Sequence, residues 1–138
     1  MRSPKVGALE LKICVVIPTY NEHENIEELV YKTENALSNN GLEGHIIIVD
    51  DNSPDGTGDL AEQLSERHTN IMVIHRPGKL GIGSAYRQAF QAIFENMHVD
   101  AVIQMDADLS HNPEAIPSFL EKLSEGFDVV IGSRYIDG

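Results

Sequence analysis

IIIVDDNSPDGT, at residues 46–57, joins an apolar run directly to an acidic segment rich in turn-forming residues. The run does not alternate apolar with polar side chains, and its β-branched composition is typical of a strand buried on both faces, as in parallel sheets. Asp, Asn, Ser, Pro and Gly then favour a turn. Leu60, Ala61 and Leu64 follow at helical spacing, so this stretch predicts a strand, a turn and a helix.

The same pattern recurs on both sides of this stretch. Further apolar runs of the same character lie at residues 13–17, 71–74, 101–103 and 129–131. Apolar residues at helical spacing follow the first three of these runs, at residues 26–37, 82–94 and 116–123. Strand and helix thus alternate four times before a fifth strand. With right-handed crossovers, this order predicts a Rossmann-like α/β fold: a doubly wound, mainly parallel sheet with helices on both faces.

Short motifs predict where the helices begin and end. Asn21 with Glu24 resembles a capping box. Ser53-Pro54 and Asn112-Pro113 each place a proline just inside a helix start. Gly126 is placed to end the last helix.

Composition limits the classes of protein that this chain can represent. Its 138 residues suit one domain, which we expect over residues 11–138 after a flexible tail at residues 1–10. A net charge of −12 argues against binding to nucleic acid, which requires a basic surface. Cys14 is the single cysteine, so an intrachain disulfide is excluded, and a lone cysteine fits a reducing compartment. Every apolar run falls short of the roughly 20 residues that cross a bilayer.

Polar residues follow every predicted strand, and open parallel sheets bind ligands at the carboxyl ends of their strands. These segments are Pro18 to Glu22, Asp50 to Thr57, His75 to Gly81, Asp106 to Asp108 and Gly132 to Arg134. Carboxylates therefore gather at one edge of the predicted sheet. Arg76, Lys79 and Arg134 lie near the same edge.

Asp106-Ala107-Asp108 is the sharpest chemical signal in the chain. Two carboxylates that lie about 4 Å apart repel each other by about 4 kcal/mol at an effective dielectric constant near 20. A divalent cation relieves this repulsion and can hold a diphosphate at the same time. Oxygen ligands favour Mg²⁺ or Mn²⁺ over zinc. Taken alone, an Asp-x-Asp pair is more often a solvated turn, but its position after a buried strand favours the metal site.

Several other residues at this edge of the sheet allow two interpretations. Asp51 could accept hydrogen bonds from a ribose or a base, while Ser53 caps a helix. Tyr20 could stack on a base or cover the end of the sheet. Gly81 belongs to a Gly-x-Gly pair that is weak evidence for dinucleotide binding and more simply permits a turn. We expect His111, close to the acidic pair, to have a surface role.

These motifs together resemble glycosyltransferase family 2. The segments that carry the resemblance are VVIPTYNEHENI, IIIVDDNSPDGTGDLAEQL, HRPGKLGIGSAYRQAF, MDADLSHNPEAIP and DVVIGSRY, over roughly residues 13–135. DDNSPDGT and DADLSHNPE are most similar to the dolichyl-phosphate and polyprenyl-phosphate mannosyltransferases of that family. The resemblance implies a GT-A nucleotide-sugar-binding domain with GDP-mannose as the donor.

The resemblance also assigns roles to individual positions. The nucleotide-sugar-binding positions that it implies are Pro18, Tyr20, Glu22, Val49, Asp51, Asp106, Ala107, Asp108, Ser110 and Arg134. Val49 and Asp51 would lie around the guanosine. Asp106 and Asp108 would hold Mg²⁺ or Mn²⁺ with the diphosphate, and Asp108 and Arg134 would be catalytic. Ser110 stands where some relatives have Gln.

The implied reaction transfers mannose from GDP-mannose to a dolichyl or polyprenyl phosphate with inversion. Family members continue into an acceptor-side segment, so we expect this chain to be the donor-binding part, truncated before that segment and inactive alone. An uncovered apolar edge would let such a fragment self-associate. The resemblance implies a cytoplasmic protein, peripheral to the cytoplasmic face of a membrane in its full-length form.

Other functions remain open at this point. A family relative could use UDP-glucose or another nucleotide sugar. A sugar nucleotidyltransferase could share the fold and the metal pair. From other classes, the chain could be a Mg²⁺-binding receiver-type signalling domain or a noncatalytic nucleotide-sugar-binding module.

Overall fold

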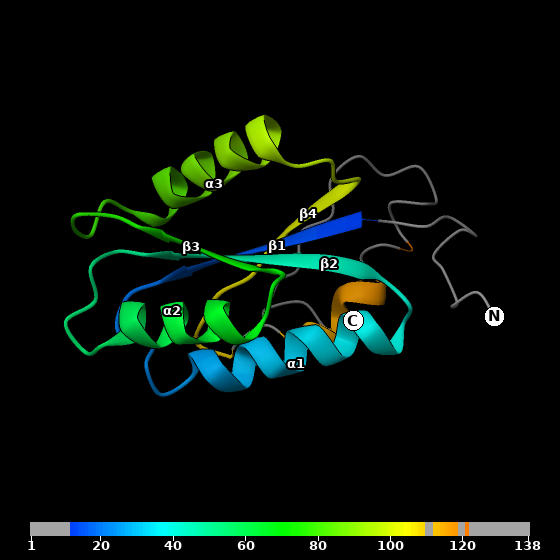
Figure 1. Ribbon diagram of the computed structural model, residues 1–138, viewed down its shortest axis with the longest axis horizontal. Coiled ribbons are helices and arrows are strands. Elements are labelled where there is room, and N and C mark those ends of the chain that lie inside the picture. Colours follow the sequence, from blue (N-terminus) through cyan, green and yellow to red (C-terminus); the bar gives the residue numbers. More distant parts are fainter. Residues whose placement is uncertain (1–11, 110–111, 119–120, 122–138) are drawn as a thin grey trace.

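The computed structural model describes residues 12–109, 112–118 and 121 of the chain. Strands and helices alternate along these residues, as predicted (Figure 1). The elements are β1 (Lys12–Thr19), α1 (Ile26–Asn39), β2 (Glu43–Asp50), α2 (Thr57–Arg67), β3 (Ile71–His75), α3 (Ile82–Asn96), β4 (Ala101–Gln104) and the 3₁₀ helix η2 (Pro113–Ala115). The predicted strand at residues 129–131 and the predicted helix end at Gly126 lie outside the described residues.

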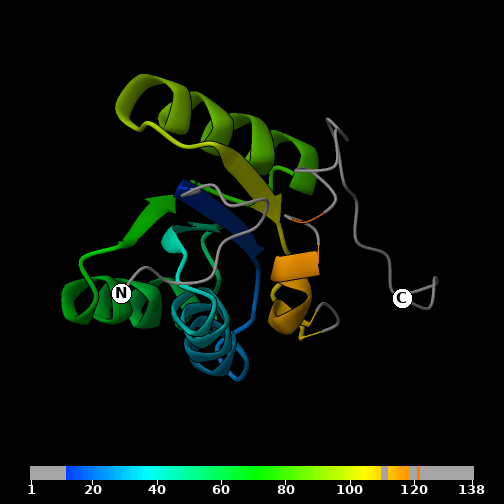
Figure 2. The ribbon, with the colours of Figure 1, turned by 90° about the vertical axis from the view of Figure 1, so that its right-hand side faces the viewer.

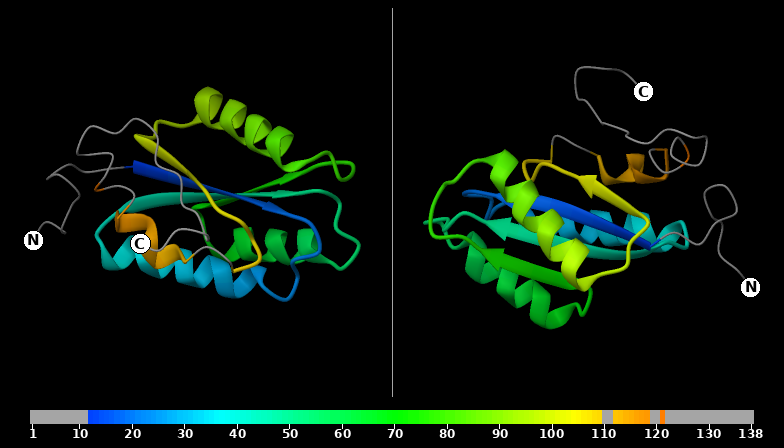
Figure 3. Two further views of the ribbon diagram at one scale, coloured as in Figure 1. Left: turned by 180° about the vertical axis from the view of Figure 1, so that it is seen from behind. Right: turned by 90° about the horizontal axis from the view of Figure 1, so that it is seen from above.

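The described strands form one sheet in the order β3-β2-β1-β4, and each pair among them is parallel. The chain steps from β1 through β2 to β3 and then returns to the other side of β1 to form β4. As a result, α1 and α2 cover one face of the sheet and α3 covers the other (Figures 2 and 3). The predicted doubly wound fold is confirmed. Its strand order reverses between β1 and β4, the point at which open α/β sheets bind ligands.

β1 shows why the strands lack polar alternation. Ile13, Val15 and Ile17 pack into the core beneath α1 and α2. Cys14 and Val16 point the other way, into the core beneath α3. Because helices cover both faces, every position from Ile13 to Ile17 needs an apolar side chain. Burial raises the pKa of the Cys14 thiol to about 12, so this cysteine packs as a small apolar residue and is not a nucleophile.

Two predicted helix starts are wrong because the residues concerned belong to the loops before the helices. Asn21 and Glu24 precede α1, which begins only at Ile26, and Asn21 has a positive φ of 56°. Ser53-Pro54 lies in the turn before α2, which begins at Thr57. Both loops are therefore longer than predicted. They bring more polar residues to the carboxyl ends of the strands.

The predicted helix start at Asn112-Pro113 is confirmed. Pro113 opens η2, and the Asn112 side chain accepts a hydrogen bond of 3.0 Å from the Glu114 backbone amide.

The apolar face of α3 is narrower than predicted. Ala85, Ala89 and Ile93 are buried against the sheet, whereas Ile82 and Phe94 are exposed, Phe94 by 80%. Phe94 follows Ala85 by nine residues, which places it about half a turn away around the helix axis.

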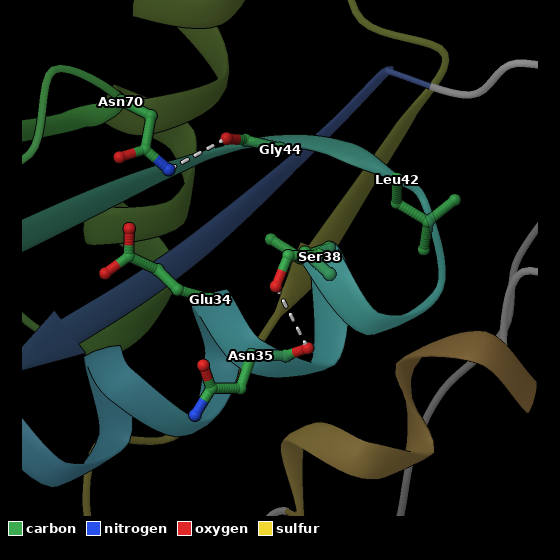
Figure 4. Close-up of a pocket in the computed structure, with 7 residues that line it drawn as sticks. Glu34, Asn35, Ser38, Leu42, Gly44 and Asn70 are labelled. Atoms are coloured by element: carbon green, nitrogen blue, oxygen red, sulfur yellow. Dashed lines mark hydrogen bonds between the residues drawn. The ribbon is translucent and has the colours of Figure 1, made fainter. Parts of the chain in front are cut away.

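A pocket of about 230 Å³ lies near the amino-terminal end of β2, away from the carboxyl ends of the strands. It is lined by α1, the start of β2 and Asn70 (Figure 4). Asn70 donates a hydrogen bond of 3.1 Å from its side-chain amide to the Gly44 carbonyl. Gly44 also faces Leu37, and a Cβ atom added to Gly44 would overlap the Leu37 side chain. The glycine therefore permits α1 to approach β2 closely.

We predict that Gly44→Ala lowers the free energy of unfolding by about 1–3 kcal/mol, because the buried Leu37 must leave its rotamer. Urea unfolding measures the change. Gly83→Ala is the matched control, since a Cβ atom there meets nothing within 4 Å, and it should be neutral or raise stability by up to about 1 kcal/mol. Equal stabilities for the two variants would show that Leu37 repacks without cost.

Candidate functional site

The carboxyl ends of the four described strands are tied to one another by backbone hydrogen bonds. The Met105 amide donates to the Val16 carbonyl at 3.0 Å, which joins the end of β4 to β1. The Asp51 amide donates to Thr19 at 3.1 Å and the Arg76 amide donates to Asp50 at 2.8 Å. The loops after β1, β2 and β3 consequently lie together, at the left of Figure 1. Hydrogen bonds therefore link neighbouring strand ends all along the predicted polar edge.

Asp50 holds the turn after β2. Its carboxylate is buried and accepts hydrogen bonds from the Thr19 hydroxyl at 2.8 Å and from the Ser53 hydroxyl at 2.6 Å and amide at 3.0 Å. The Ser53 oxygen accepts in turn from the Asn21 amide of the neighbouring loop at 2.9 Å. Asp50 therefore joins the loops after β1 and β2, and Ser53 serves this turn and does not cap a helix.

A second set of contacts joins the same two loops. Asp55 accepts hydrogen bonds from the His23 amide at 3.1 Å, from the Thr57 amide at 3.0 Å and from the Thr57 hydroxyl. The Thr57 oxygen also accepts from the Glu22 amide at 3.0 Å. Desolvation acts to raise the pKa of Asp55, but the hydrogen bonds from Thr57 and His23 outweigh it and hold that pKa below 3.8.

Asp51 forms a buried ion pair with Arg76. Its two oxygens accept from Arg76 Nε at 2.6 Å and Nη2 at 2.9 Å, and the Leu80 amide adds a third hydrogen bond of 3.2 Å. The Arg76 and Asp51 side chains are 2% and 10% exposed. Arg76 also donates to the Ser84 hydroxyl at 2.7 Å and to the Gly81 carbonyl at 2.9 Å. Because a carboxylate offers about four lone-pair sites, about one remains for a ligand.

The other predicted nucleotide-binding residues of β1 and β2 differ in what they expose. Tyr20 keeps 38% of its surface in solvent. Pro18 is half-buried. Glu22 is also half-buried, and its Oε2 accepts a hydrogen bond of 3.0 Å from the Asn25 side chain. Val49 is fully buried in the core beneath α3, so its side chain is withdrawn from the edge and only its backbone can meet a ligand.

Asp106, Ala107 and Asp108 follow β4 directly, on the far side of β1 from Asp51. Asp106 is half-buried, Ala107 packs into the core beneath α1 and α2, and Asp108 is exposed. The next residue, Leu109, has a positive φ of 66°, a conformation that is rare for a bulky side chain. The backbone thus bends sharply immediately after the acidic pair.

Tyr86, on α3, belongs to the surroundings of this pair. Desolvation first, and then the negative charge of Asp106, raise the pKa of the Tyr86 hydroxyl to about 12. Tyr86 lies within residues 82–94, the stretch predicted as a helix, but the sequence gives no sign of its proximity to Asp106. The side chains of Asp106 and Asp108 offer only oxygen atoms as ligands, the type that Mg²⁺ and Mn²⁺ prefer.

Within the described ranges, no group of three or more His, Cys, Asp or Glu side chains could hold a metal ion. The metal site that the sequence predicts therefore rests, among the described residues, on the two carboxylates of Asp106 and Asp108 alone. Ser110, His111 and Arg134 lie outside the described residues.

Two contacts at this edge of the sheet were not predicted from the sequence. Arg76 was expected near it, but its pairing with Asp51, 25 residues earlier, was not foreseen. The available signal was the position of both residues at the ends of neighbouring strands. Lys79 lies over the ring of Tyr20, with its Nζ 4.7 Å from the ring centroid. No pattern in the sequence indicates that contact.

The fold and the polar edge of the sheet together define an α/β protein of the GT-A type. Its sheet is parallel, and an acidic pair lies at the switch point, where the strand order reverses between β1 and β4. Residues 14–138 match the family described as Glycosyl transferase family 2. The chain belongs to this family.

Curated relatives cover most of this chain. A dolichol-phosphate mannosyltransferase of Pyrococcus furiosus is 44% identical over 128 residues, which are 93% of this chain and 34% of that protein. A polyprenol monophosphomannose synthase of Mycolicibacterium smegmatis is 41% identical over 125 residues, 90% of this chain and 45% of that protein. The chain thus spans between a third and a half of the length of these two relatives.

Solved structures share the fold. A mannosyltransferase from Pyrobaculum calidifontis, in complex with GDP-Man and Mn²⁺, matches with a TM-score of 0.62 and 22% identity over 74% of this chain and 29% of that chain. Glucosyl-3-phosphoglycerate synthase from Mycobacterium tuberculosis, in complex with Mn²⁺, UDP and phosphoglyceric acid, matches with a TM-score of 0.63 and 24% identity. The match covers 89% of this chain and 44% of that chain. At these identities the likeness confirms the fold. In the part of the chain that the structure describes, no helix has the length and apolar character to span a membrane.

We predict that Asp51→Asn lowers the free energy of unfolding by about 3–5 kcal/mol, because it leaves the buried Arg76 guanidinium without a counter-ion. Urea unfolding measures the loss. Glu28→Gln is the control, since Glu28 pairs with Lys32 at 2.9 Å on an exposed helix face, and it should cost less than about 0.5 kcal/mol. A loss below about 1 kcal/mol for Asp51→Asn would show that the pair contributes little to the fold.

Asp55 should make stability depend on pH in the acid range. Its folded-state pKa is lowered, so its contribution is present above the unfolded-state pKa and is lost as the pH falls through the folded-state pKa. We therefore expect Asp55→Asn to destabilise the protein at about pH 6 and to destabilise it less near pH 3, which lies below the unfolded-state pKa. Urea unfolding at both pH values tests this, with Asp59→Asn as the control for removing an acidic group from the first turn of α2. A stability difference that does not shrink on acidification would contradict the prediction.

Proposed function

We propose that this chain carries the donor-binding part of a transferase that moves mannose from GDP-mannose to a dolichyl or polyprenyl phosphate. The observation that supports this most directly is the position of Asp106 and Asp108. They follow β4 at the switch point, beside the end of β1 that carries Tyr20. The family membership and the names of the relatives, which are mannosyltransferases and a phosphomannose synthase, support the choice of sugar and acceptor.

Asp106 and Asp108 would hold Mg²⁺ or Mn²⁺, with the Ala107 backbone alongside the donor. The metal would supply positive charge that stabilises the leaving diphosphate. Asp108 and Arg134 are the residues that we propose as catalytic, with Arg134 close to the donor phosphates or mannose. Ser110 is proposed as a further residue of the donor site.

The nucleoside would lie on the other side of β1. Tyr20 offers a partly exposed ring for the base, and Pro18 and Glu22 flank it. Asp51 can offer a ligand about one lone-pair site beyond its contacts with Arg76 and Leu80. Val49 can contribute only its backbone, because its side chain is buried.

The acceptor oxygen would attack the anomeric carbon from the face opposite GDP and invert its configuration. A phosphate monoester has a second pKa near 6, so it is largely ionised at pH 7 and needs no strong general base. We propose that residues 11–138 form the donor-binding domain and that contacts to the lipid phosphate come from other parts of the protein. Such an enzyme would work at the cytoplasmic face of a membrane, where a lipid-linked acceptor is available.

Metal-dependent binding of the donor tests this proposal. We predict that GDP-mannose binds at least about tenfold more tightly with Mn²⁺ than with a chelator, because the metal offsets repulsion between the carboxylates and the diphosphate. Calorimetry measures both affinities. Asp106→Asn and Asp108→Asn should each reduce the gain from metal. Glu66→Gln, an exposed position on α2, is the charge-matched control.

Two results would contradict the proposal in different ways. Equal affinity with and without metal would remove the metal assignment. Tighter binding of UDP-glucose than of GDP-mannose would exclude mannose transfer and leave another nucleotide-sugar reaction of the same family.

A further inference from the structure

Lys79 lies where its ammonium group can take part in recognition of the donor. It belongs to the loop between β3 and α3, and its Nζ lies 4.7 Å from the centroid of the Tyr20 ring. A cation over an aromatic face is attracted by the ring quadrupole. Tyr20 is the residue that we propose for stacking on the base. Lys79 is therefore already at the surface that a base would use.

The backbone that follows Lys79 is held in place by hydrogen bonds. The next residue, Leu80, donates its amide to Asp51 Oδ2 at 3.2 Å. The Gly81 carbonyl then accepts from Arg76 Nη2 at 2.9 Å. Gly81 has a φ of 98°, which strongly favours glycine. Because the loop is anchored directly beside Lys79, the fold of the loop brings the Lys79 side chain within reach of Tyr20.

Strand order shows which part of the donor Lys79 can meet. Tyr20 follows β1, and the loop of Lys79 follows β3, two strands away in the order β3-β2-β1-β4. Asp106 and Asp108 follow β4, on the opposite side of β1. Neighbouring strands lie about 4.8 Å apart, so β3 and β4 are separated by about three such spacings. Lys79 is thus on the side of the base, away from the carboxylates proposed for the metal and diphosphate.

We propose that Lys79 is a specificity-determining residue for the base of the donor, an inference that rests on the proposed function. The ammonium group offers only hydrogen-bond donors, and its flexible stem lets it move from the Tyr20 ring to the edge of a base that stacks there. Guanine presents two neighbouring acceptors on one edge, O6 and N7, whereas adenine presents an amino donor beside N7. Lys79 therefore favours guanine over adenine at this site.

Competition binding with the protein and Mn²⁺ tests the inference. The competitors of GDP-mannose are GDP, IDP, ADP and pyrophosphate, and calorimetry gives the affinity of each. The proteins compared are the wild type, Lys79→Met, Lys79→Arg and Lys32→Met. Lys79→Met keeps the length of the side chain and removes its charge. Lys32→Met is the matched control, because Lys32 is an exposed lysine on α1.

We expect Lys79→Met to weaken GDP about five- to tenfold, as for the loss of one charge-assisted hydrogen bond at an accessible site. IDP should weaken by the same factor, because it retains O6 and N7 and lacks only the 2-amino group. ADP should weaken less, and pyrophosphate should not change. Lys79→Arg should retain most of the preference for GDP over ADP, and Lys32→Met should retain all of it.

The possible failures separate the two proposals. An equal loss for all four ligands in Lys79→Met would show that Lys79 acts only as a general positive charge, and an unchanged ratio of GDP to ADP affinity would show no role in base selection. Either result overturns the inference and leaves the proposed function standing. A wild-type protein that does not prefer GDP over ADP overturns the proposed donor and the inference with it.

Discussion

The ion pair between Arg76 and Asp51 organises the edge of the sheet where the donor would bind. Removing two charges from water is costly unless their hydrogen bonds are satisfied. Here Arg76 donates to Asp51, Ser84 and Gly81, and Leu80 donates to Asp51. These contacts fasten the loop after β3 to the end of β2. The position of Lys79 over Tyr20 depends on that attachment.

The loops after β1 and β2 are joined by hydrogen bonds and not by an ion pair. Charge-assisted bonds end on the carboxylates of Asp50 and Asp55, and neutral bonds end on the hydroxyl oxygens of Ser53 and Thr57. Asn21 and His23 donate their amides to Ser53 and Asp55 across the two loops. Much of the acidic charge after β2 therefore serves the fold. This explains how an acidic chain can gather carboxylates at one edge without destabilising it, since each of these groups has donors from the backbone or from hydroxyl side chains.

The fold was predictable because buried parallel strands leave a local signature. The apolar runs at residues 13–17 and 46–49 contain no polar alternation, and both are covered on two faces. Loop chemistry was less predictable. Asn21 and Glu24 have the spacing of a capping box, yet tertiary hydrogen bonds to the neighbouring loop hold this segment outside α1. The pairing of Arg76 with Asp51 joins residues 25 positions apart, and only the strand order brings them together.

The same contacts change how base recognition can work. A carboxylate at the end of β2 was expected to accept hydrogen bonds from the nucleoside. In the structure Asp51 already accepts three, from Arg76 and the Leu80 amide, and about one acceptor site remains. One such contact gives limited discrimination among bases. Under the proposed function, selectivity would draw on groups that the fold adds beside Asp51. The loop that Arg76 anchors brings one such group, Lys79, to the ring of Tyr20.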